Sequence, residues 1–315
     1  MVRVVAATDA QVVSVGETVL EGHRRDTPVA PRYDVVYLRD PRGWYYRYSH
    51  LKVIDDSLVP GRYIAQGDPI GLLGKEGGSG GWSHLHFEIK CRQPSGEWGT
   101  QEGYAFLWQA YQQQYQPDLI AVARPHHLVF TGEEVLLDGS RSWSRSGQVA
   151  GYQWLFGDGS VASAATVRRT YETPGRYSEV LRVSDDAGNL DYDFAVVIVV
   201  DREHPDRLVP SIHPNYFPTR DLHPGDPISF KVRTFNTTDG FETWDFGDGS
   251  PPVEVRSDGN AVKLAADGYA VTIHRYAQPG DYIARVERTN AFGVTAVGHL
   301  HVRVTRPTDS EVDSR

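Results

Sequence analysis

Cysteine is almost absent from this sequence. Among 315 residues there is one, Cys91. An internal disulfide framework is therefore excluded, and with it the small secreted scaffolds that depend on such bridges. A lone cysteine is compatible with a bacterial exported protein and with a cytosolic one. We expect Cys91 to be a small buried apolar residue rather than a reactive thiol.

Clusters of positive charge and long apolar runs are also missing. The chain has 32 basic and 41 acidic side chains, a net charge of -9. With no lysine or arginine cluster, this balance argues against nucleic acid as a partner. No apolar run approaches the roughly 20 residues that span a bilayer. Thr8 and Asp9 interrupt the apolar residues at the start of the sequence, which therefore do not predict a signal peptide.

Glycine, proline and aromatic residues are abundant instead. There are 31 glycines and 19 prolines, together with 7 Trp, 17 Tyr and 11 Phe. This composition favours turns and strands, so we expect little helix, and the length suits two or three domains. One helix is expected at residues 104–115, where large apolar residues recur at helical spacing just before Pro117.

Two histidines, His84 and His86, follow a glycine-rich loop that begins at Gly77. Side chains of a strand alternate between its faces, so both imidazoles are expected to face one cleft while Leu85 and Phe87 point into a packed layer. A neutral imidazole is a good zinc ligand and a proton carrier near neutral pH. The pair therefore indicates metal-assisted hydrolysis.

The same spacing recurs at His299 and His301 without the same context. No glycine loop flanks this second pair, and no partner histidine precedes it. Motif matches need structural context. We therefore expect His299 and His301 to be solvent-side residues of a terminal strand rather than metal ligands.

A third histidine, His50, lies in Tyr48-Ser49-His50-Leu51. Glycines at positions 61, 67, 71 and 74 then separate short apolar stretches, which predicts strands joined by tight turns. Taken in order, these motifs resemble the lysostaphin-type, or LytM-like, zinc endopeptidases, which cut the peptide bridges of bacterial cell walls. The resemblance covers about residues 2–90.

The resemblance implies a role for each histidine. His86 is similar to the zinc ligand of the family, His84 to the catalytic histidine beside the metal, and His50 to a second histidine that lines the cleft. In the family the zinc activates a water and polarises the scissile carbonyl, while the imidazoles take the proton and stabilise the oxyanion. The loop before the histidine strand forms a wall of the groove, which assigns substrate contacts to Gly77, Gly78, Ser79, Gly80, Gly81 and Trp82.

Trp82 departs from the small residue or proline often found at its position in the family. Its ring could stack on a sugar or a peptide plane of the substrate, or pack against the barrel.

The zinc site implied by the resemblance is incomplete. Family members carry a His-x-x-x-Asp element before the strand that corresponds to residues 4–13 here, and those two residues complete the site. Because a catalytic zinc takes three protein ligands, a chain with His86 alone is expected to bind zinc weakly or not at all. His23 and Asp26 lie three residues apart beside two arginines, so we do not expect them to substitute. A missing N-terminal segment and a degenerate, non-cutting relative both stay open, and the intact downstream motifs favour the first.

The second half of the sequence repeats. Trp154-Leu-Phe-Gly-Asp-Gly-Ser160 returns as Trp244-Asp-Phe-Gly-Asp-Gly-Ser250, and each copy is followed by Tyr-x-x-Pro-Gly-x-Tyr. The second copy has about fifteen extra residues before Ile273, expected to form a longer hairpin or loop. This pattern predicts two antiparallel sandwiches with the tryptophan in the core and Gly-Asp-Gly in a tight turn.

These copies resemble PKD (polycystic kidney disease) domains, which are common spacers and adhesive modules in extracellular proteins. Asp158 and Asp248 suggest calcium sites, but one carboxylate per turn supplies too few oxygens, so we expect both to stabilise their turns.

The predicted fold is all-β and multidomain. A glycine-rich, barrel-like or sandwich-like peptidase module with one short helix (1–116) precedes two Ig-like PKD β-sandwiches (117–202 and 203–307) and a disordered tail (308–315). The predicted function is zinc-dependent cleavage of peptide cross-links in peptidoglycan. The alternative is a non-catalytic peptidoglycan-binding or regulatory protein that uses the same groove.

Peptidoglycan peptides or another cell-envelope polymer are the expected partners, and the expected location is extracellular or in the cell envelope. Biotinyl and lipoyl carrier domains share the glycine-spaced strands, but Lys75 lacks their hairpin context.

Overall fold

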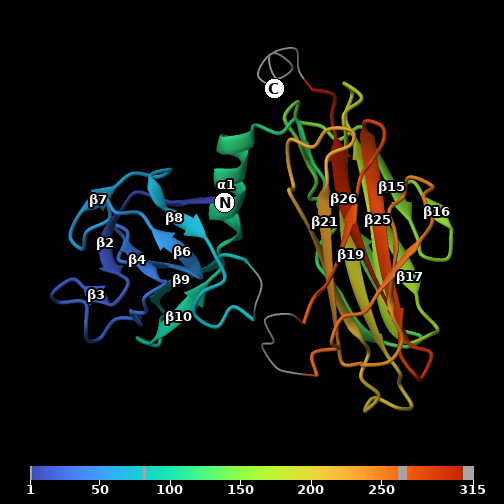
Figure 1. Ribbon diagram of the computed structural model, residues 1–315, viewed down its shortest axis with the longest axis horizontal. Helices are drawn as coiled ribbons and strands as arrows, with labels where there is room; N and C mark the ends of the chain where they lie inside the picture. Colours follow the sequence, from blue (N-terminus) through green and yellow to red (C-terminus); the bar gives the residue numbers. More distant parts are fainter. Residues whose placement is uncertain (1, 81–82, 262–267, 308–315) are drawn as a thin grey trace. The chain divides into compact units, whose positions relative to one another are not determined.

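The chain is built almost entirely from β-strands (Figure 1), as the sequence predicts. The computed structural model describes residues 2–80, 83–261 and 268–307. These residues form two compact units, one ending at Gln116 and the other beginning at Pro117. The expected tail, 308–315, lies outside the described residues. Among the described residues, no helix is long and apolar enough to cross a membrane.

The first unit contains two antiparallel sheets and one helix. The larger sheet has the strand order β10-β9-β5-β4-β2-β3, with β7 pairing to β2, and the smaller sheet has the order β1-β8-β6. Their bounds are β1 (Arg3–Val5), β2 (Ala10–Val15), β3 (Thr18–Val19), β4 (Val36–Arg39), β5 (Tyr45–Ser49), β6 (Leu51–Ile54), β7 (Tyr63–Ile64), β8 (Pro69–Leu73), β9 (His86–Arg92) and β10 (Trp98–Gln101). The helix is α1 (Tyr104–Tyr115), in the predicted place before Pro117.

The larger sheet carries buried side chains on both faces. Alternation along β5 sends Tyr46 and Tyr48 into the main core and Tyr45 into a smaller cluster on the other side. Phe87 of β9 and Phe106 of α1 pack against the main core. Because Phe87 points inward there, its neighbours His86 and Glu88 must face the opposite side of the sheet.

Glycine is required where the two strands β6 and β8 approach each other. Gly71 of β8 lies so close to β6 that a β-carbon at this position would overlap the carbonyl oxygen of Val53. Here glycine allows two backbones to approach more closely than any side chain would permit. Cys91 on β9 is a free, buried cysteine, as predicted.

The second unit contains the two sequence repeats. The strands of the first repeat are β11 (Leu119–Ile120), β12 (His127–Phe130), β13 (Glu134–Asp138), β14 (Trp143–Ser144), β15 (Gly151–Leu155), β16 (Val161–Ala162), β17 (Thr166–Thr170), β18 (Gly175–Ser184) and β19 (Leu190–Val200). Those of the second are β20 (Ser211–Phe217), β21 (Ile228–Phe235), β22 (Glu242–Asp245), β23 (Val253–Val255), β24 (Ala270–His274), β25 (Gly280–Thr289) and β26 (Thr295–Val304).

Each repeat is a sandwich with its tryptophan at the centre. Trp154 and Trp244 are both fully buried, in separate hydrophobic cores. The segment with the extra residues of the second repeat also contains β23, which pairs with β22 as β16 pairs with β15 in the first repeat. Residues 262–267, also within this insertion, lie outside the described residues.

The aspartates of the two Gly-Asp-Gly turns bind their own turns. Asp158 Oδ1 accepts hydrogen bonds from the backbone N–H and the hydroxyl of Ser160, and Asp248 does the same for Ser250. Arg169 donates to the other oxygen of Asp158, whereas His274 bonds the other oxygen of Asp248. The carboxylates therefore serve as turn residues, as the sequence predicts.

The two repeats share one sheet. Its order is β12-β19-β18-β26-β25-β22-β23; β15 pairs with β18, and β16 pairs with β15. The link is a short parallel pairing of β18 with β26, in which Gly175 is opposite Thr295 and Arg176 opposite Ala296. Arg176 also donates to the carbonyl oxygen of Val297.

The predicted exposure of His299 and His301 is wrong. Both lie on β26, where the first repeat covers them: the His299 ring stacks on Phe194 and the His301 ring contacts Tyr192. His299 Nδ1 is shielded from solvent, and the His301 side chain is 15% exposed. Alternation correctly placed both histidines on one face of the strand, but the sequence does not show that β19 packs on that face.

Candidate functional site

Three histidine rings of the first unit lie together. The ring centroids of His50 and His84 are 4.7 Å apart, and those of His50 and His86 are 6.0 Å apart. His50 lies between β5 and β6, and His86 is the first residue of β9. The structure therefore brings together the three histidines singled out in the sequence.

The structure differs from the prediction at His84. We expected His84 and His86 on one strand, but β9 begins at His86 and His84 precedes it. The backbone N–H of His84 donates instead to the carbonyl oxygen of Gly74, at 3.3 Å. The N–H of Gly74 in turn donates to the carbonyl oxygen of His50, at 2.9 Å. Gly74 therefore links the backbones of the two histidines.

His50 is buried and has an unusual backbone. Its φ is 68°, in the left-handed region that few residues other than glycine adopt. Its backbone N–H donates to Asp34 Oδ2 at 2.9 Å, and its Nδ1 lies 2.5 Å from the carbonyl oxygen of Glu76. Because a carbonyl oxygen can only accept, Nδ1 carries a proton, so in the neutral form of the ring Nε2 is the basic nitrogen.

Asp34 is a buried carboxylate behind His50. It accepts two hydrogen bonds from the guanidinium of Arg32, one of them 2.7 Å long at Oδ2. Burial alone would raise the pKa of Asp34, but the hydrogen bonds from Arg32 and from the N–H of His50 lower it below its usual value. Asp34 is therefore ionised around neutral pH.

The glycine-rich loop packs against the same ion pair. A β-carbon at Gly77 would overlap Asp34 Oδ2 and the guanidinium of Arg32, and the N–H of Gly77 donates to the hydroxyl of Tyr33 at 3.0 Å. Ser79 is buried, and its hydroxyl donates to the carbonyl oxygen of Lys75. Gly77, Gly78 and Gly80 all have positive φ. Gly81 and Trp82, also expected to contact substrate, lie outside the described residues.

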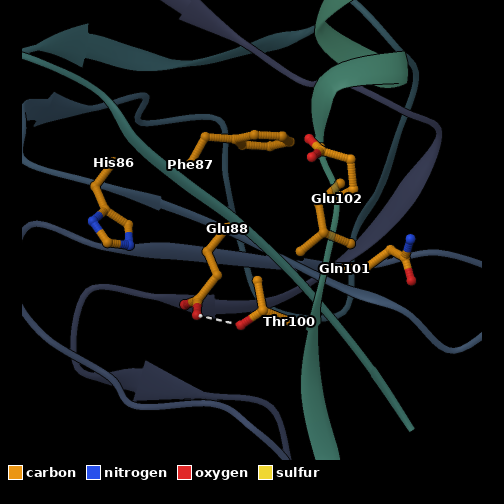
Figure 2. A pocket seen from close by; sticks show the side chains of 8 residues that line it. His86, Phe87, Glu88, Thr100, Gln101 and Glu102 are labelled. Carbon is orange, nitrogen blue, oxygen red and sulfur yellow. Dashed lines mark hydrogen bonds between the residues drawn. The ribbon is translucent and has the colours of Figure 1, made fainter. Parts of the chain in front are cut away.

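A cavity of about 540 Å³ opens beside His86. Its lining residues are His86, Phe87, Glu88, Ile89, Thr100, Gln101, Glu102 and Gly103. Figure 2 shows His86 and Glu88 on one side of β9, with Thr100 bonded to Glu88 and Glu102 across the cavity. The glycine-loop residues assigned to the groove are not among those that line this cavity.

The cavity exists because β10 pairs with only part of β9. The pairing starts at Ile89, opposite Gln101, and continues to Arg92. The first part of β9, from His86 to Glu88, pairs with β5 on its other side and does not pair with β10. One edge of β9 is therefore open next to His86.

Charged and polar side chains of β5 lie on the same face as His86. Glu88 is 3.7 Å from Arg47, and Ser49 is the cross-strand neighbour of His86. Burial, together with the positive charge of Arg47, lowers the pKa of His86, although Glu88 acts in the opposite direction. The neutral imidazole, which can accept a proton or bind a metal, is therefore favoured at His86.

The residues present do not form a complete zinc site. Across residues 2–80, 83–261 and 268–307, no group of three or more His, Cys, Asp or Glu side chains is arranged to hold a metal ion. His23, considered as a substitute ligand, is bonded through Nδ1 to the hydroxyl of Tyr45 at 2.8 Å. The described residues therefore do not bring a full set of metal ligands together around His86.

Comparison with known proteins divides the chain in the same way as the motifs. Residues 2–96 match the family model for peptidase family M23, and residues 117–199 and 217–304 match models of the PKD domain. A curated relative, collagenase ColA of Clostridium perfringens, is 30% identical over 95 residues. That match covers 30% of this chain and 8% of the collagenase, so the chain spans less than a tenth of this relative's length.

Solved structures give weaker matches. The fibronectin(III)-like modules of Clostridium thermocellum CbhA align with 60% of this chain and 94% of their own, at 14% identity and a TM-score of 0.21. Dimeric latent PorU from Porphyromonas gingivalis aligns with 96% of this chain and 34% of its own, at 11% identity and a TM-score of 0.25. At these TM-scores the alignments support no structural conclusion. The family models show that the chain carries a peptidase family M23 domain followed by two PKD domains.

Proposed function

We propose that this protein acts on peptide cross-links of bacterial peptidoglycan. The observation that supports the proposal best is the cluster of His50, His84 and His86 inside a domain of peptidase family M23. His86, one member of the cluster, borders a cavity and an open strand edge, which gives an extended peptide access to its imidazole. Imidazoles that can gain or lose a proton near neutral pH are suited to amide hydrolysis.

The chain's own residues would bind and orient the peptide and carry its protons. His50 donates from Nδ1 to the carbonyl oxygen of Glu76, which makes Nε2 the proton-accepting nitrogen in the neutral form of the ring. By the family resemblance, His84 takes the catalytic role and His86 the role of zinc ligand. Because the described residues do not complete a ligand set, any zinc binding by this chain is proposed to be weak.

The PKD domains are proposed to position the M23 domain on the cell envelope. Domains of this kind are common spacers in extracellular proteins, so an extracellular or envelope location is part of the proposal. The collagenase relative is named for another substrate, collagen. Since the match covers 8% of that protein, it gives little support for collagen as a substrate of this chain.

A second candidate function is peptidoglycan binding without cleavage. The observation that favours it is the incomplete ligand group around His86. A domain with a preserved groove and no firmly bound zinc could hold a wall peptide, or regulate an active relative, without cutting the peptide.

Purified peptidoglycan sacculi test the proposal directly. The protein is incubated with sacculi in the presence of zinc or of a chelator. Bound protein is measured by sedimentation, and cleavage is measured by the release of new amino groups. We expect the protein to sediment with the sacculi and to release new amino groups slowly, in a zinc-dependent reaction. His84→Ala should abolish the release and keep the binding, whereas His204→Ala, an exposed histidine outside the M23 domain, should change neither.

The outcomes separate the two candidates. Binding without any release, even with zinc, would support the non-catalytic function. A protein that neither sediments nor releases amino groups would contradict both.

A further inference from the structure

A buried ion pair lies directly behind one histidine of the cluster. Asp34 is 1% exposed and accepts from both the Arg32 side chain and the backbone N–H of His50. Asp34 Oδ2 is also 3.6 Å from His50 Nδ1. This carboxylate has no place in the motifs that identify the site, and its environment suggests a specific task.

The first part of that task concerns the backbone of His50. A residue other than glycine with φ near 68° is strained and persists only where its surroundings hold it. Here the N–H of His50 is held by Asp34 and its carbonyl oxygen by the N–H of Gly74. Without the carboxylate, the buried N–H of His50 would lack an acceptor, and the backbone would have reason to relax.

The second part concerns the direction of the ring. With the backbone fixed, Nδ1 of His50 meets the carbonyl oxygen of Glu76, and the ring lies 4.7 Å from that of His84. A relaxed backbone would move Nδ1 away from Glu76 and would change the distance to His84. The ring position therefore depends on a hydrogen bond made by the backbone of the same residue.

The third part concerns the glycine-rich loop. Gly77 lies against Asp34 and Arg32 at a distance that admits no β-carbon. The same ion pair therefore touches both His50 and the loop that leads to His84.

We propose that Asp34, held by Arg32, is a positioning residue that fixes His50 and the Gly77 loop relative to each other. The proposal refines the proposed function, because His50 and His84 belong to the site assigned there. Asp34 acts through His50 and through the loop, with no contact to substrate of its own.

The matched control is a second buried aspartate in the same unit. Asp40 is 2% exposed, accepts from Arg42 two residues away, and accepts from the backbone N–H of Trp44 at 2.9 Å. It also accepts from the hydroxyl of Tyr46. Within the described part of the chain, Asp40 therefore repeats the burial and the bonding pattern of Asp34 but bonds no histidine.

The experiment uses the full chain with ¹⁵N-labelled histidine rings. Ring nitrogen signals report which nitrogen carries the proton, and comparison with His50→Gln assigns the signal of His50. In the unmodified chain we expect one tautomer at His50, protonated at Nδ1. Asp34→Ala should abolish this single-tautomer signal. Gly77→Ala should do the same, because the added methyl group would displace the carboxylate of Asp34.

Two further variants separate positioning from simple stability. Asp34→Asn keeps an oxygen that can accept the N–H of His50, so it should restore the single tautomer. Asp40→Ala should lower the melting temperature about as much as Asp34→Ala and leave the His50 signal unchanged.

The proposal is overturned if the His50 signal survives in Asp34→Ala, or if Asp40→Ala perturbs it equally. Equal loss in Asp34→Asn and Asp34→Ala would also overturn it, because the accepting oxygen would then not be what matters. None of these measurements needs turnover or zinc. A negative result with sacculi would therefore refute the proposed function and leave the role of Asp34 standing.

Discussion

The two core tryptophans occupy equivalent positions in the PKD domains but differ in one hydrogen bond. Trp154 Nε1 donates to the carbonyl oxygen of Ala164 at 3.1 Å, whereas Trp244 Nε1 is buried with no acceptor among the described residues. Replacement by phenylalanine removes a similar volume at both sites. It removes a hydrogen bond only in the first domain.

We therefore expect Trp154→Phe to cost about 1–3 kcal/mol more than Trp244→Phe, because the first change gives up a hydrogen bond whereas the second removes a buried donor that already lacks an acceptor among the described residues. Urea denaturation of the two variants measures the difference, and each serves as the control for the other. Equal losses would show that the bond to Ala164 contributes nothing measurable. Replacement of either tryptophan by alanine should cost roughly 3–5 kcal/mol, since a large cavity remains.

The affinity of the chain for zinc tests the prediction that His86 lacks the partner ligands of a complete site. Zinc sites with a full set of protein ligands bind with apparent free energies of about 10–16 kcal/mol in small zinc-finger peptides. The M23 domain of this chain should fall well short, because the described residues contain no group that could hold a metal. Calorimetric titration should show weak binding at most, reduced further by His86→Ala and unaffected by His204→Ala. A tight one-to-one site would contradict this prediction.

At the scale of single residues, the sequence identifies the histidines that the chemistry needs, but not the residue that holds them in position. Motif order and spacing predict the grouping of His50, His84 and His86, and the structure brings the three rings together. Asp34 could not be found in this way. An Arg-x-Asp sequence is common, and the left-handed backbone of His50 depends on contacts with residues far away in the chain.

Strand β26 carries the clearest acid-sensitive group among the described residues. Burial, together with the positive charges of Arg285 and Arg176, lowers the pKa of His299 from 6.5 to about 4, although a backbone hydrogen bond involving Ser178 acts in the opposite direction. The folded protein therefore keeps this ring neutral, while the unfolded chain takes up a proton below pH 6.5. The stability linked to His299 is complete above that pH and is lost as the pH falls towards 4.

We expect the second unit to lose up to roughly 3 kcal/mol from this group between neutral pH and pH 4. Denaturation at several pH values measures the loss. His299→Phe keeps a ring to stack on Phe194 and cannot be protonated, so its stability should depend less on pH over this range. The exposed His204→Phe serves as the control. Identical pH dependence in the unmodified chain and in His299→Phe would contradict the prediction.

Element boundaries differ in how well local sequence predicts them. Helix α1 has the predicted bounds because its apolar spacing and Pro117 are both local signals. The start of β9 is shifted because the N–H of His84 pairs with Gly74 rather than continuing the strand. The burial of His299 depends on β19 of the other PKD domain, and no pattern within β26 could have revealed it.

At the scale of the molecule, the shared sheet changes what the two PKD domains are expected to do. The sequence predicts two separate sandwiches, and each does have its own core. The pairing of β18 with β26 nevertheless joins them, and Arg303 of β26 donates to the carbonyl oxygen of Leu190 at 2.6 Å. A joined pair is a stiffer spacer than two domains on a flexible linker.

We predict that residues 117–202 fold when expressed alone but are less stable than the same domain within residues 117–307. The separated domain loses its contacts to β26 and exposes the rings of Tyr192 and Phe194, which His301 and His299 cover in the pair. Thermal unfolding should show one cooperative transition for 117–307, at a higher midpoint than for 117–202. Arg303→Ala, which removes the bond to Leu190, should move the midpoint of the pair towards that of the single domain. Equal midpoints in all three proteins would mean that the domains are independent and that the shared sheet adds no stability.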